Sequence, residues 1–329
     1  MAQRLTLTAL VTCLSATIAL AAGGKPRATA VSRFAGVDGV RLHYVDWGGG
    51  GPWLLLVPGG CDTAFVFGDI APALTSTHHV VGLTPRGCGQ SDRPAEGYDL
   101  SSQVEEIRAF ADTLGAERFS LAGHSSGSGT LTQFAKRYPT RVDRLIYFDP
   151  VFRFVAPGLD DLMSTAIGRV VGTNMMASLT AWRKTSRVWE LGVWTPAMER
   201  DLQEKVTVDA TGRLHFLRPE PARRSEQVTR DMESGAYFET SIARPALLIF
   251  AMDTDRDRLR AFDRETRQRL LPLVEATEQR RGDEINDFRR ANPSARIVEI
   301  RHASHYVFAH KPREVIREIE RFLAAPASQ

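Results

Sequence analysis

The sequence predicts an α/β fold, with a mostly parallel eight-stranded sheet flanked by helices and a helical insertion in its second half. Short apolar strand patterns alternate with helix patterns up to residue 150 and return after residue 241. Strands and helices that alternate at this spacing are typical of a parallel sheet covered on both faces. Between residues 151 and 240 the alternation stops, and large apolar side chains occur without a comparable strand run.

The strands can be placed in order along the chain. Two short strand patterns flank the hairpin signal Asp38-Gly39 within residues 34–45. Six further strand patterns then follow, and the first of them is a continuous apolar run that is typical of a buried parallel strand. They are residues 53–57, 79–83, 119–122, 145–148, 246–250 and 295–300.

The helix patterns fall between and after these strands. Ser102-Gln103-Val104-Glu105 matches a capping box, which predicts a helix from Ser102 that ends at Gly115. Two further helices are expected over residues 126–137 and 312–323. A charge-dense stretch at 256–292 keeps rough helical spacing, and Pro272 predicts a break within it.

These patterns divide the chain into four parts. Residues 1–22 are expected to be a signal peptide, and residues 30–150 form the first part of the core. Residues 151–240 form a helical cap over the active edge of the sheet, and residues 241–325 complete the core around the helical insert at 256–292.

The first residues have the features of an export signal. Arg4 precedes an uncharged, apolar stretch at residues 5–22 that ends in small side chains, as a cleaved signal peptide does. A retained membrane anchor and a lipidated Cys13 are the alternatives. The prediction is a secreted or periplasmic protein with no membrane span in the mature chain.

Charge and motif content exclude several classes of function. The net charge is only +3, and the arginines alternate with acids, so a nucleic-acid partner is not expected. The sequence contains no zinc-spaced cluster of cysteine and histidine and no dinucleotide fingerprint, so neither metal nor cofactor is expected. The expected partner is a small-molecule substrate, and the oligomeric state stays open.

The strongest chemical signal is Gly123-His124-Ser125-Ser126-Gly127, which matches G-x-S-x-G between a predicted strand and a predicted helix. The chain must turn so sharply there that Ser125 takes a strained backbone conformation, and the two glycines remove side chains that would collide. Ser125 is then displayed at a helix N-terminus, where N–H groups can stabilise an anion. Ser125 is therefore the predicted nucleophile.

A serine nucleophile needs a base, and the base needs an orienting acid. His305 follows the last predicted strand and is the expected base, with His302 as its competitor. The acid is expected in the loop after residue 250, where Asp255 is the first choice. Asp253 and, after an earlier strand, Asp149 are the alternatives.

The oxyanion formed in acyl transfer needs two backbone N–H donors. Ser126, directly after the nucleophile, is expected to supply one. Gly60 in the loop Pro58-Gly59-Gly60-Cys61 is expected to supply the other, because glycines let the backbone approach closely.

With these motifs the chain resembles the α/β-hydrolase superfamily, in its cap-containing serine hydrolase and esterase branch. The resemblance extends over about residues 35–325 apart from the insertions, and it includes the segment Pro85–Pro94, which is similar to an R-G-x-G-x-S motif. A serine at position 125 separates the chain in mechanism from the epoxide hydrolase and haloalkane dehalogenase branches, which it does not resemble there. Pro58-Gly59 departs from the usual His-Gly of the oxyanion strand.

The resemblance implies a serine hydrolase that cleaves a carboxylic ester or lactone of a small, largely apolar substrate. One alternative is an aminopeptidase of the iminopeptidase type, which would need cap carboxylates such as Glu190, Glu199 or Glu204 to hold an ammonium group. Another is a non-catalytic binding protein on the same fold.

The resemblance also implies that Cys61 and Cys88 lie close together, because each follows one of two neighbouring strands. An exported protein can keep a disulfide. Whether the two cysteines pair stays open, because their loops are long enough to point the side chains apart.

Overall fold

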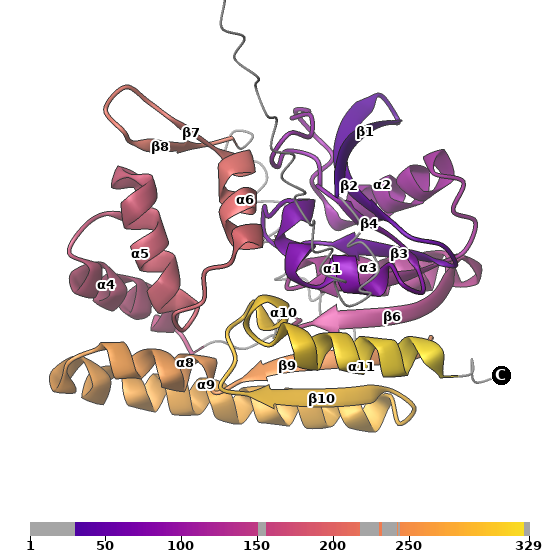
Figure 1. The fold of residues 1–329 in the computed structure, drawn as a ribbon. Helices are drawn as coiled ribbons and strands as arrows, with labels where there is room; N and C mark the ends of the chain where they lie inside the picture. Colours follow the sequence, from indigo (N-terminus) through magenta and orange to yellow (C-terminus); the bar gives the residue numbers. More distant parts are fainter. Residues whose placement is uncertain (1–29, 151–155, 218–229, 232–241, 243, 326–329) are drawn as a thin grey trace, which may run out of the picture.

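A sheet of eight strands forms the centre of the structure, a computed structural model that describes residues 30–150, 156–217, 230–231, 242 and 244–325 (Figure 1). Its order is β1-β2-β4-β3-β5-β6-β9-β10, and β2 runs antiparallel to both neighbours while all later neighbours pair in parallel. The strands are β1 (Val31–Val37), β2 (Val40–Gly48), β3 (Trp53–Val57), β4 (His79–Leu83), β5 (Phe119–His124), β6 (Val142–Phe148), β9 (Ala246–Met252) and β10 (Arg296–Arg301). The predicted eight-stranded, mostly parallel sheet is confirmed.

The apolar runs reflect burial on both faces of the sheet. In β3, Leu55 belongs to the apolar core on one face, and Leu54 and Leu56 belong to the core on the other. The helices α2 (Leu100–Thr113) and α3 (Gly127–Arg137) cover the first face, and α1 (Ala71–Leu74), α10 (Val307–His310) and α11 (Pro312–Ala324) cover the second. Because successive strand residues point to opposite faces, a central strand needs apolar side chains throughout.

The start of α2 differs from the prediction. The helix begins at Leu100, and the side chain of Asp99 caps it by accepting a hydrogen bond from the Ser102 N–H. The capping box predicted at Ser102 is therefore wrong. Asp99 provides the same kind of cap three residues earlier, since a carboxylate accepts well from the N–H groups of a first helical turn.

The segment predicted as a helical cap also contains a small hairpin. Its described part holds α4 (Leu159–Val171), α5 (Leu179–Trp189) and α6 (Pro196–Lys205), followed by the antiparallel pair β7 (Val206–Val208) and β8 (Leu214–Phe216) (Figure 1). Strands this short carry no readable alternation, which is why the sequence pattern missed them. Residues 151–155 and most of 218–241 lie outside the described part of the chain.

The charge-dense insert forms α8 (Thr254–Arg258) and the 28-residue helix α9 (Arg264–Ala291), which lies along β9 and β10 in Figure 1. The break predicted at Pro272 is wrong, because α9 continues through it. Leu270 and Val274, on either side of the proline, are buried in one apolar cluster with α4 residues such as Ile167. This packing offsets the lost backbone hydrogen bond.

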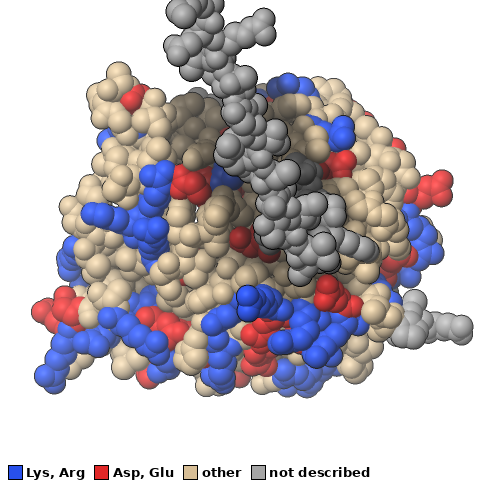
Figure 2. All heavy atoms as spheres, in the orientation of Figure 1, with Lys and Arg blue, Asp and Glu red and all other residues tan. Residues whose placement is uncertain are grey.

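The surface is mixed in charge on the face drawn in Figure 2, where basic and acidic side chains alternate. Within the described ranges, no helix is both long enough and apolar enough to cross a membrane. The predicted signal peptide at residues 1–22 lies outside those ranges.

Candidate active site

The G-x-S-x-G segment forms a tight strand–turn–helix connection between β5 and α3. Ser125 has a φ of 51°, the strained left-handed conformation that the sequence predicts. A Cβ on Gly123 would lie 2.8 Å from a methyl carbon of Leu131, and one on Gly127 would lie 2.7 Å from the Val57 carbonyl oxygen. Both glycines are therefore required by space, and Ser125 is held at the start of α3.

His305 reaches this elbow from the loop after β10. Its carbonyl oxygen accepts a hydrogen bond from His124 Nε2 at 3.1 Å, and the two imidazole rings lie 4.5 Å apart. The competitor His302 is exposed and places its Nδ1 2.9 Å from Asp257 Oδ2. The structure thus brings His305, and not His302, beside the residue that precedes Ser125.

The acid next to His305 is Asp149, not Asp255. His305 Nδ1 lies 2.6 Å from Asp149 Oδ2. Asp149 directly follows β6, and the carbonyl oxygen of its neighbour Phe148 accepts the Ser125 N–H at 3.1 Å. Of the three acids considered from the sequence, Asp149 is the one hydrogen-bonded to His305.

Asp255 points elsewhere because β9 ends differently from the expected loop. Asp253 takes a left-handed φ of 63°, and α8 begins at the next residue. Asp255 then lies in the first turn of α8, where its Oδ1 is 2.5 Å from Arg258 Nη1. Asp253 forms an ion pair with Arg301 at 3.2 Å. The expectation that Asp255 orients His305 is therefore wrong in this structure.

Asp149 is tightly fixed in its buried position. Its backbone N–H donates to the Ile249 carbonyl oxygen at 2.8 Å, and its Oδ1 accepts from the Ala251 N–H at 2.9 Å. The same Oδ1 forms an ion pair with Arg281 of α9. Both carboxylate oxygens therefore have partners, as a buried anion requires.

The ionisation of the pair follows from these contacts. Burial alone would raise the pKa of Asp149, but the charge of Arg281 and the hydrogen bond from His305 hold it below the usual value. Burial alone would lower the pKa of His305, but the hydrogen bond and charge of Asp149 outweigh it, and the pKa is raised. For the neighbouring His124, burial lowers the pKa to about 3, so its ring is neutral.

The two residues expected to stabilise an oxyanion lie together beside the elbow. The Gly60 N–H donates to Ser126 Oγ at 2.9 Å, and Gly60 adopts a left-handed φ of 56°. A Cβ on Gly59 would lie 2.6 Å from the Cβ of Ser125, so this loop runs close against the nucleophile. Glycine is needed there for the close approach of the two backbones.

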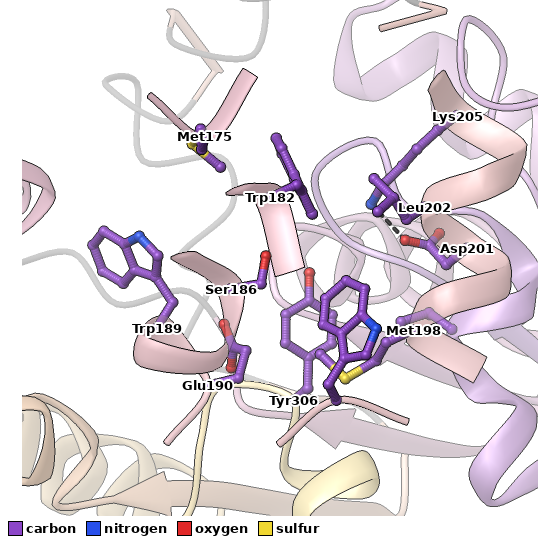
Figure 3. Close-up of a pocket in the computed structure, with 12 residues that line it drawn as sticks. Met175, Trp182, Ser186, Trp189, Glu190, Met198, Asp201, Leu202, Lys205 and Tyr306 are labelled. Atoms are coloured by element: carbon purple, nitrogen blue, oxygen red, sulfur yellow. Dashed lines mark ion pairs between the residues drawn. The ribbon is translucent and has the colours of Figure 1, made fainter. Parts of the chain in front are cut away.

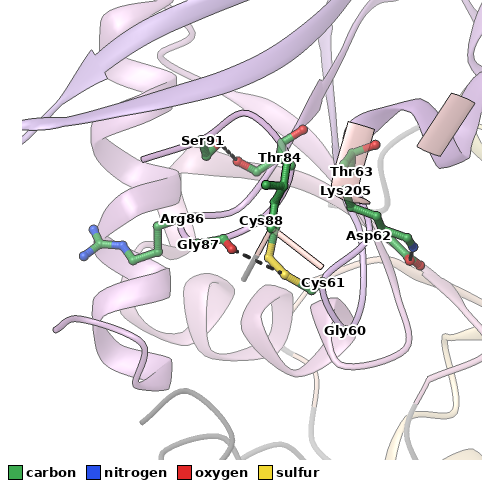
Figure 4. Close-up of a disulfide and its surroundings, with 12 residues drawn as sticks. Gly60, Cys61, Asp62, Thr63, Thr84, Arg86, Gly87, Cys88, Ser91 and Lys205 are labelled. Carbon is green, nitrogen blue, oxygen red and sulfur yellow. Dashed lines mark hydrogen bonds and ion pairs between the residues drawn. A yellow bond between two sulfur atoms is a disulfide. The ribbon is translucent and has the colours of Figure 1, made fainter. Parts of the chain in front are cut away.

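A disulfide joins Cys61 in this loop to Cys88, with 5.3 Å between their Cα atoms (Figure 4). The pairing that the sequence left open is thus present in the structure. The two cysteines follow β3 and β4, which pair in parallel and so end at the same edge of the sheet. The bond ties the Gly60 loop to the loop after β4.

A buried charge cluster, which sequence reasoning did not identify, links the cap to the same loop. Lys205 Nζ lies 2.5 Å from a carboxylate oxygen of Asp62 and 2.5 Å from one of Asp201. The Tyr306 hydroxyl donates to Asp62 at 2.8 Å, and the Thr63 N–H donates to Asp201 at 2.6 Å. The two carboxylates raise the pKa of Lys205 despite its burial. The only sequence signal was the scarcity of lysines, of which the chain has five.

A cavity of about 180 Å³ borders this cluster, between the cap helices and the core (Figure 3). Its lining is mostly aromatic and aliphatic, with four polar residues among it. The lining residues are Val66, Met175, Trp182, Ser186, Trp189, Glu190, Trp194, Met198, Asp201, Leu202, Lys205 and Tyr306. Tyr306, the chain neighbour of His305, lines the cavity, and so does Glu190, whose charge acts on His305.

Glu190 is a carboxylate of this cavity whose charge acts on the candidate base. Its side chain is buried, and its Oε2 makes no hydrogen bond to any residue that the structure describes. Burial raises its pKa, while the charges of Arg258 and His305 and the nearby Ser304 hydroxyl and Tyr306 N–H act in the opposite direction. Of the two other expected cap acids, Glu199 is bound by Arg183 and Glu204 by Arg200. Among the described residues, no cluster of histidine, cysteine and acidic side chains is arranged to hold a metal ion.

Comparison with known proteins agrees with this architecture. A family model for the alpha/beta hydrolase fold matches residues 52–207. The chain is 24% identical over 311 residues to a cis-3-alkyl-4-alkyloxetan-2-one decarboxylase from Shewanella oneidensis, covering 88% of this chain and 87% of that protein. It is 28% identical over 188 residues to an N-formylmaleamate deformylase from Pseudomonas putida, covering 52% of this chain and 69% of that protein.

A solved structure has the same fold along nearly the whole chain. The crystal structure of E-2-(acetamidomethylene)succinate hydrolase superposes with a TM-score of 0.67 and 18% identity, covering 90% of this chain and all of that one. From the sheet order, the serine elbow and the family match, the chain belongs to the α/β-hydrolase superfamily and is a hydrolase of this fold.

Proposed function

We propose that the protein is a serine hydrolase that cleaves a carboxylic ester or lactone through an acyl-enzyme. In this proposal Ser125 is the nucleophile, His305 the general base and Asp149 the orienting acid. The observation that carries the proposal is the 2.6 Å contact between His305 Nδ1 and Asp149 Oδ2 beside the strained Ser125 turn. A serine, a histidine and a buried acid are the three groups that together activate a serine hydroxyl, and the His305–Asp149 half of this arrangement is formed here.

The contacts assign a role to each nitrogen of His305. Because Nδ1 is held by Asp149, Nε2 is the atom that can accept the Ser125 hydroxyl proton as its oxygen attacks the substrate carbonyl. The imidazolium then gives this proton to the leaving alcohol, and a water molecule repeats the sequence to release the acid. Asp149 stays ionised throughout and stabilises the imidazolium.

Two backbone N–H groups, those of Ser126 and Gly60, are proposed to bind the oxyanion. Ser126 begins the turn into α3, where N–H groups point toward a developing negative charge. The Gly60 N–H now donates to the Ser126 hydroxyl, so a turn of that side chain releases it toward the substrate. The disulfide at Cys61 holds this loop in place.

The cavity beside Tyr306 is proposed to bind the apolar part of the substrate. Its walls include Trp182, Trp194 and Met198, side chains that bind hydrocarbon and aromatic groups well. A cavity of about 180 Å³ suits a small group rather than a long acyl chain.

Glu190 supports a second candidate function, an aminopeptidase or a hydrolase of amino-acid esters. Glu190 lines the cavity together with tryptophan side chains, and a carboxylate beside aromatic rings suits a substrate ammonium group. We rank it second because Arg258 lies near enough to Glu190 to offset part of its charge.

We also propose that the protein works outside the cytoplasm. The export signal expected at residues 1–22 and the disulfide between Cys61 and Cys88 both suit an oxidising compartment.

A matched substrate panel tests the two candidates. It would compare 4-nitrophenyl esters of increasing chain length with amino-acid 4-nitroanilides, using the wild type and Ser125→Ala. Higher kcat/KM on short esters, lost in Ser125→Ala, supports the first function, and preference for the anilides supports the second. No turnover of either set, or equal turnover by Ser125→Ala, would contradict both.

A further inference from the structure

The ion pair between Arg281 and Asp149 is not needed to build a serine–histidine–acid triad. Arg281 belongs to α9, in the insert between β9 and β10, and is 132 residues from Asp149 in the chain. It contacts Asp149 Oδ1, whereas His305 contacts Oδ2. The buried carboxylate of Asp149 therefore contacts the imidazole of His305 through one oxygen and the guanidinium of Arg281 through the other.

The contact is well shielded from solvent. The side chains of Asp149 and Arg281 are 4% and 16% exposed, so the ion pair is poorly screened by water. A guanidinium is permanently charged and its donors are fixed in a plane, which restricts the rotation of a bound carboxylate. The Ala251 N–H donates a hydrogen bond to the same oxygen at 2.9 Å, which restricts the rotation of the carboxylate further.

We propose that Arg281 is a positioning residue of the active site, which fixes the carboxylate of Asp149 toward His305. The inference rests on the proposed serine hydrolase function. It gives the insert that carries α9 a part in the reaction, although Arg281 itself touches neither Ser125 nor the substrate in this scheme.

Loss of the Arg281 charge should change the pH dependence of the reaction, because several charged or titratable groups surround His305. Asp149 and Glu190 raise the pKa of His305, and Arg281 lowers it. The neutral His124 lies against its ring. If the positive charge of Arg281 is removed, His305 stays protonated to a higher pH, and a protonated imidazole cannot act as a base. The acidic limb of the kcat/KM profile should therefore move up in pH.

Three variants distinguish the effect of the Arg281 charge from the effect of its hydrogen-bond geometry and from a general loss of stability. Arg281→Met removes the charge and the hydrogen bonds but keeps an unbranched side chain. Arg281→Lys keeps the charge with different geometry. Arg280→Met, at the exposed neighbouring arginine of the same helix, is the matched control.

The measurement is kcat and KM from pH 5 to 9 for the wild type and each variant, with the melting temperature of each. For Arg281→Met we expect kcat to fall about tenfold to a hundredfold with little change in KM. We expect its acidic limb to move up by roughly one pH unit. Arg281→Lys should keep the wild-type limb with an intermediate kcat, and Arg280→Met should match the wild type.

A wild-type pH profile and kcat in folded Arg281→Met would overturn the inference, and so would an equal shift in Arg280→Met. If Arg281→Met does not fold, Arg281→Gln carries the same test, since it keeps a donor and loses the charge. Failure of the proposed function is recognised separately. In that case the wild type itself shows no turnover that depends on Ser125.

Discussion

His305 Nδ1 lies 2.6 Å from Asp149 Oδ2, although the two residues are 156 positions apart in the chain. The Asp149 carboxylate follows β6, the immediate neighbour of the strand that leads to Ser125. The acid and the nucleophile therefore come from adjacent strands, and the base reaches them from the edge of the sheet, after β10.

This relationship predicts unequal effects of two Asp-to-Asn changes. Asp149→Asn should lower kcat by several orders of magnitude, because the amide no longer stabilises the imidazolium or fixes its tautomer. Asp255→Asn should stay within about threefold of the wild type, since Asp255 contacts Arg258 and not His305. Steady-state kinetics of the two purified variants test this prediction. A larger loss of kcat in Asp255→Asn than in Asp149→Asn would contradict the assignment of the acid.

The raised pKa of His305 predicts where activity is lost on acidification. The base must be neutral to accept the Ser125 proton, and Asp149 holds the His305 pKa above its ordinary value of about 6.5. The kcat/KM of the wild type should therefore fall as the pH drops through a midpoint above about 6.5. A pH profile with its midpoint well below this value would show that Asp149 does not act on His305 in solution.

The disulfide should contribute to both stability and turnover. It closes a loop with a sequence separation of 27, for which the chain-entropy estimate is about 3 to 4 kcal/mol. Cys61→Ala with Cys88→Ala should lower the unfolding free energy by about this amount and reduce kcat, because the Gly60 loop is less restrained. Denaturant unfolding and thiol counting on the denatured mature protein give the test. Two free thiols without reductant would show that the bond does not form.

The buried cluster around Lys205 predicts a large loss of stability from one substitution in the cap. Lys205→Met leaves Asp62 and Asp201 without their shared cation, and breaking a buried ion pair in this way typically costs about 3 to 5 kcal/mol. Lys184→Met, at an exposed lysine of α5, is the control and should change stability little. Equal melting temperatures for the two variants would show that the cluster is not formed.

If Glu190 binds a cation, the enzyme should prefer a charged substrate over an uncharged one of the same shape. Choline esters and their 3,3-dimethylbutyl isosteres differ only in a positive charge, and amino-acid esters add a primary ammonium. If the cavity binds a cation, the wild type should favour the charged member by about tenfold, and Glu190→Gln should abolish the difference. Trp182→Ala should weaken binding of both members. Equal kcat/KM for both esters in the wild type would show that the cavity does not bind a cation and contacts only the apolar part of the substrate.

Much of the fold could be predicted because its signals are local. The strands 53–57 and 79–83 were placed with their observed bounds, since apolar runs between turn residues suffice to mark them. Ser125 was predictable for the same reason, because the glycines that its turn requires lie within two residues of it.

What could not be predicted depends on contacts between distant segments. The choice of Asp149 over Asp255 follows from the left-handed Asp253 and the early start of α8, for which the sequence carries no clear pattern. Arg281 was one arginine among many in a charged helix until the fold placed it against Asp149. The continuity of α9 through Pro272 likewise depends on its packing against α4.

Covalent labelling tests the central claim most directly. The wild type would be treated with a fluorophosphonate, and the modified residue located by peptide mass spectrometry, beside Ser125→Ala and Asp149→Asn. The account predicts one adduct, on Ser125, that is absent in Ser125→Ala and forms orders of magnitude more slowly in Asp149→Asn. An unmodified wild type, or an adduct on another residue, would contradict it.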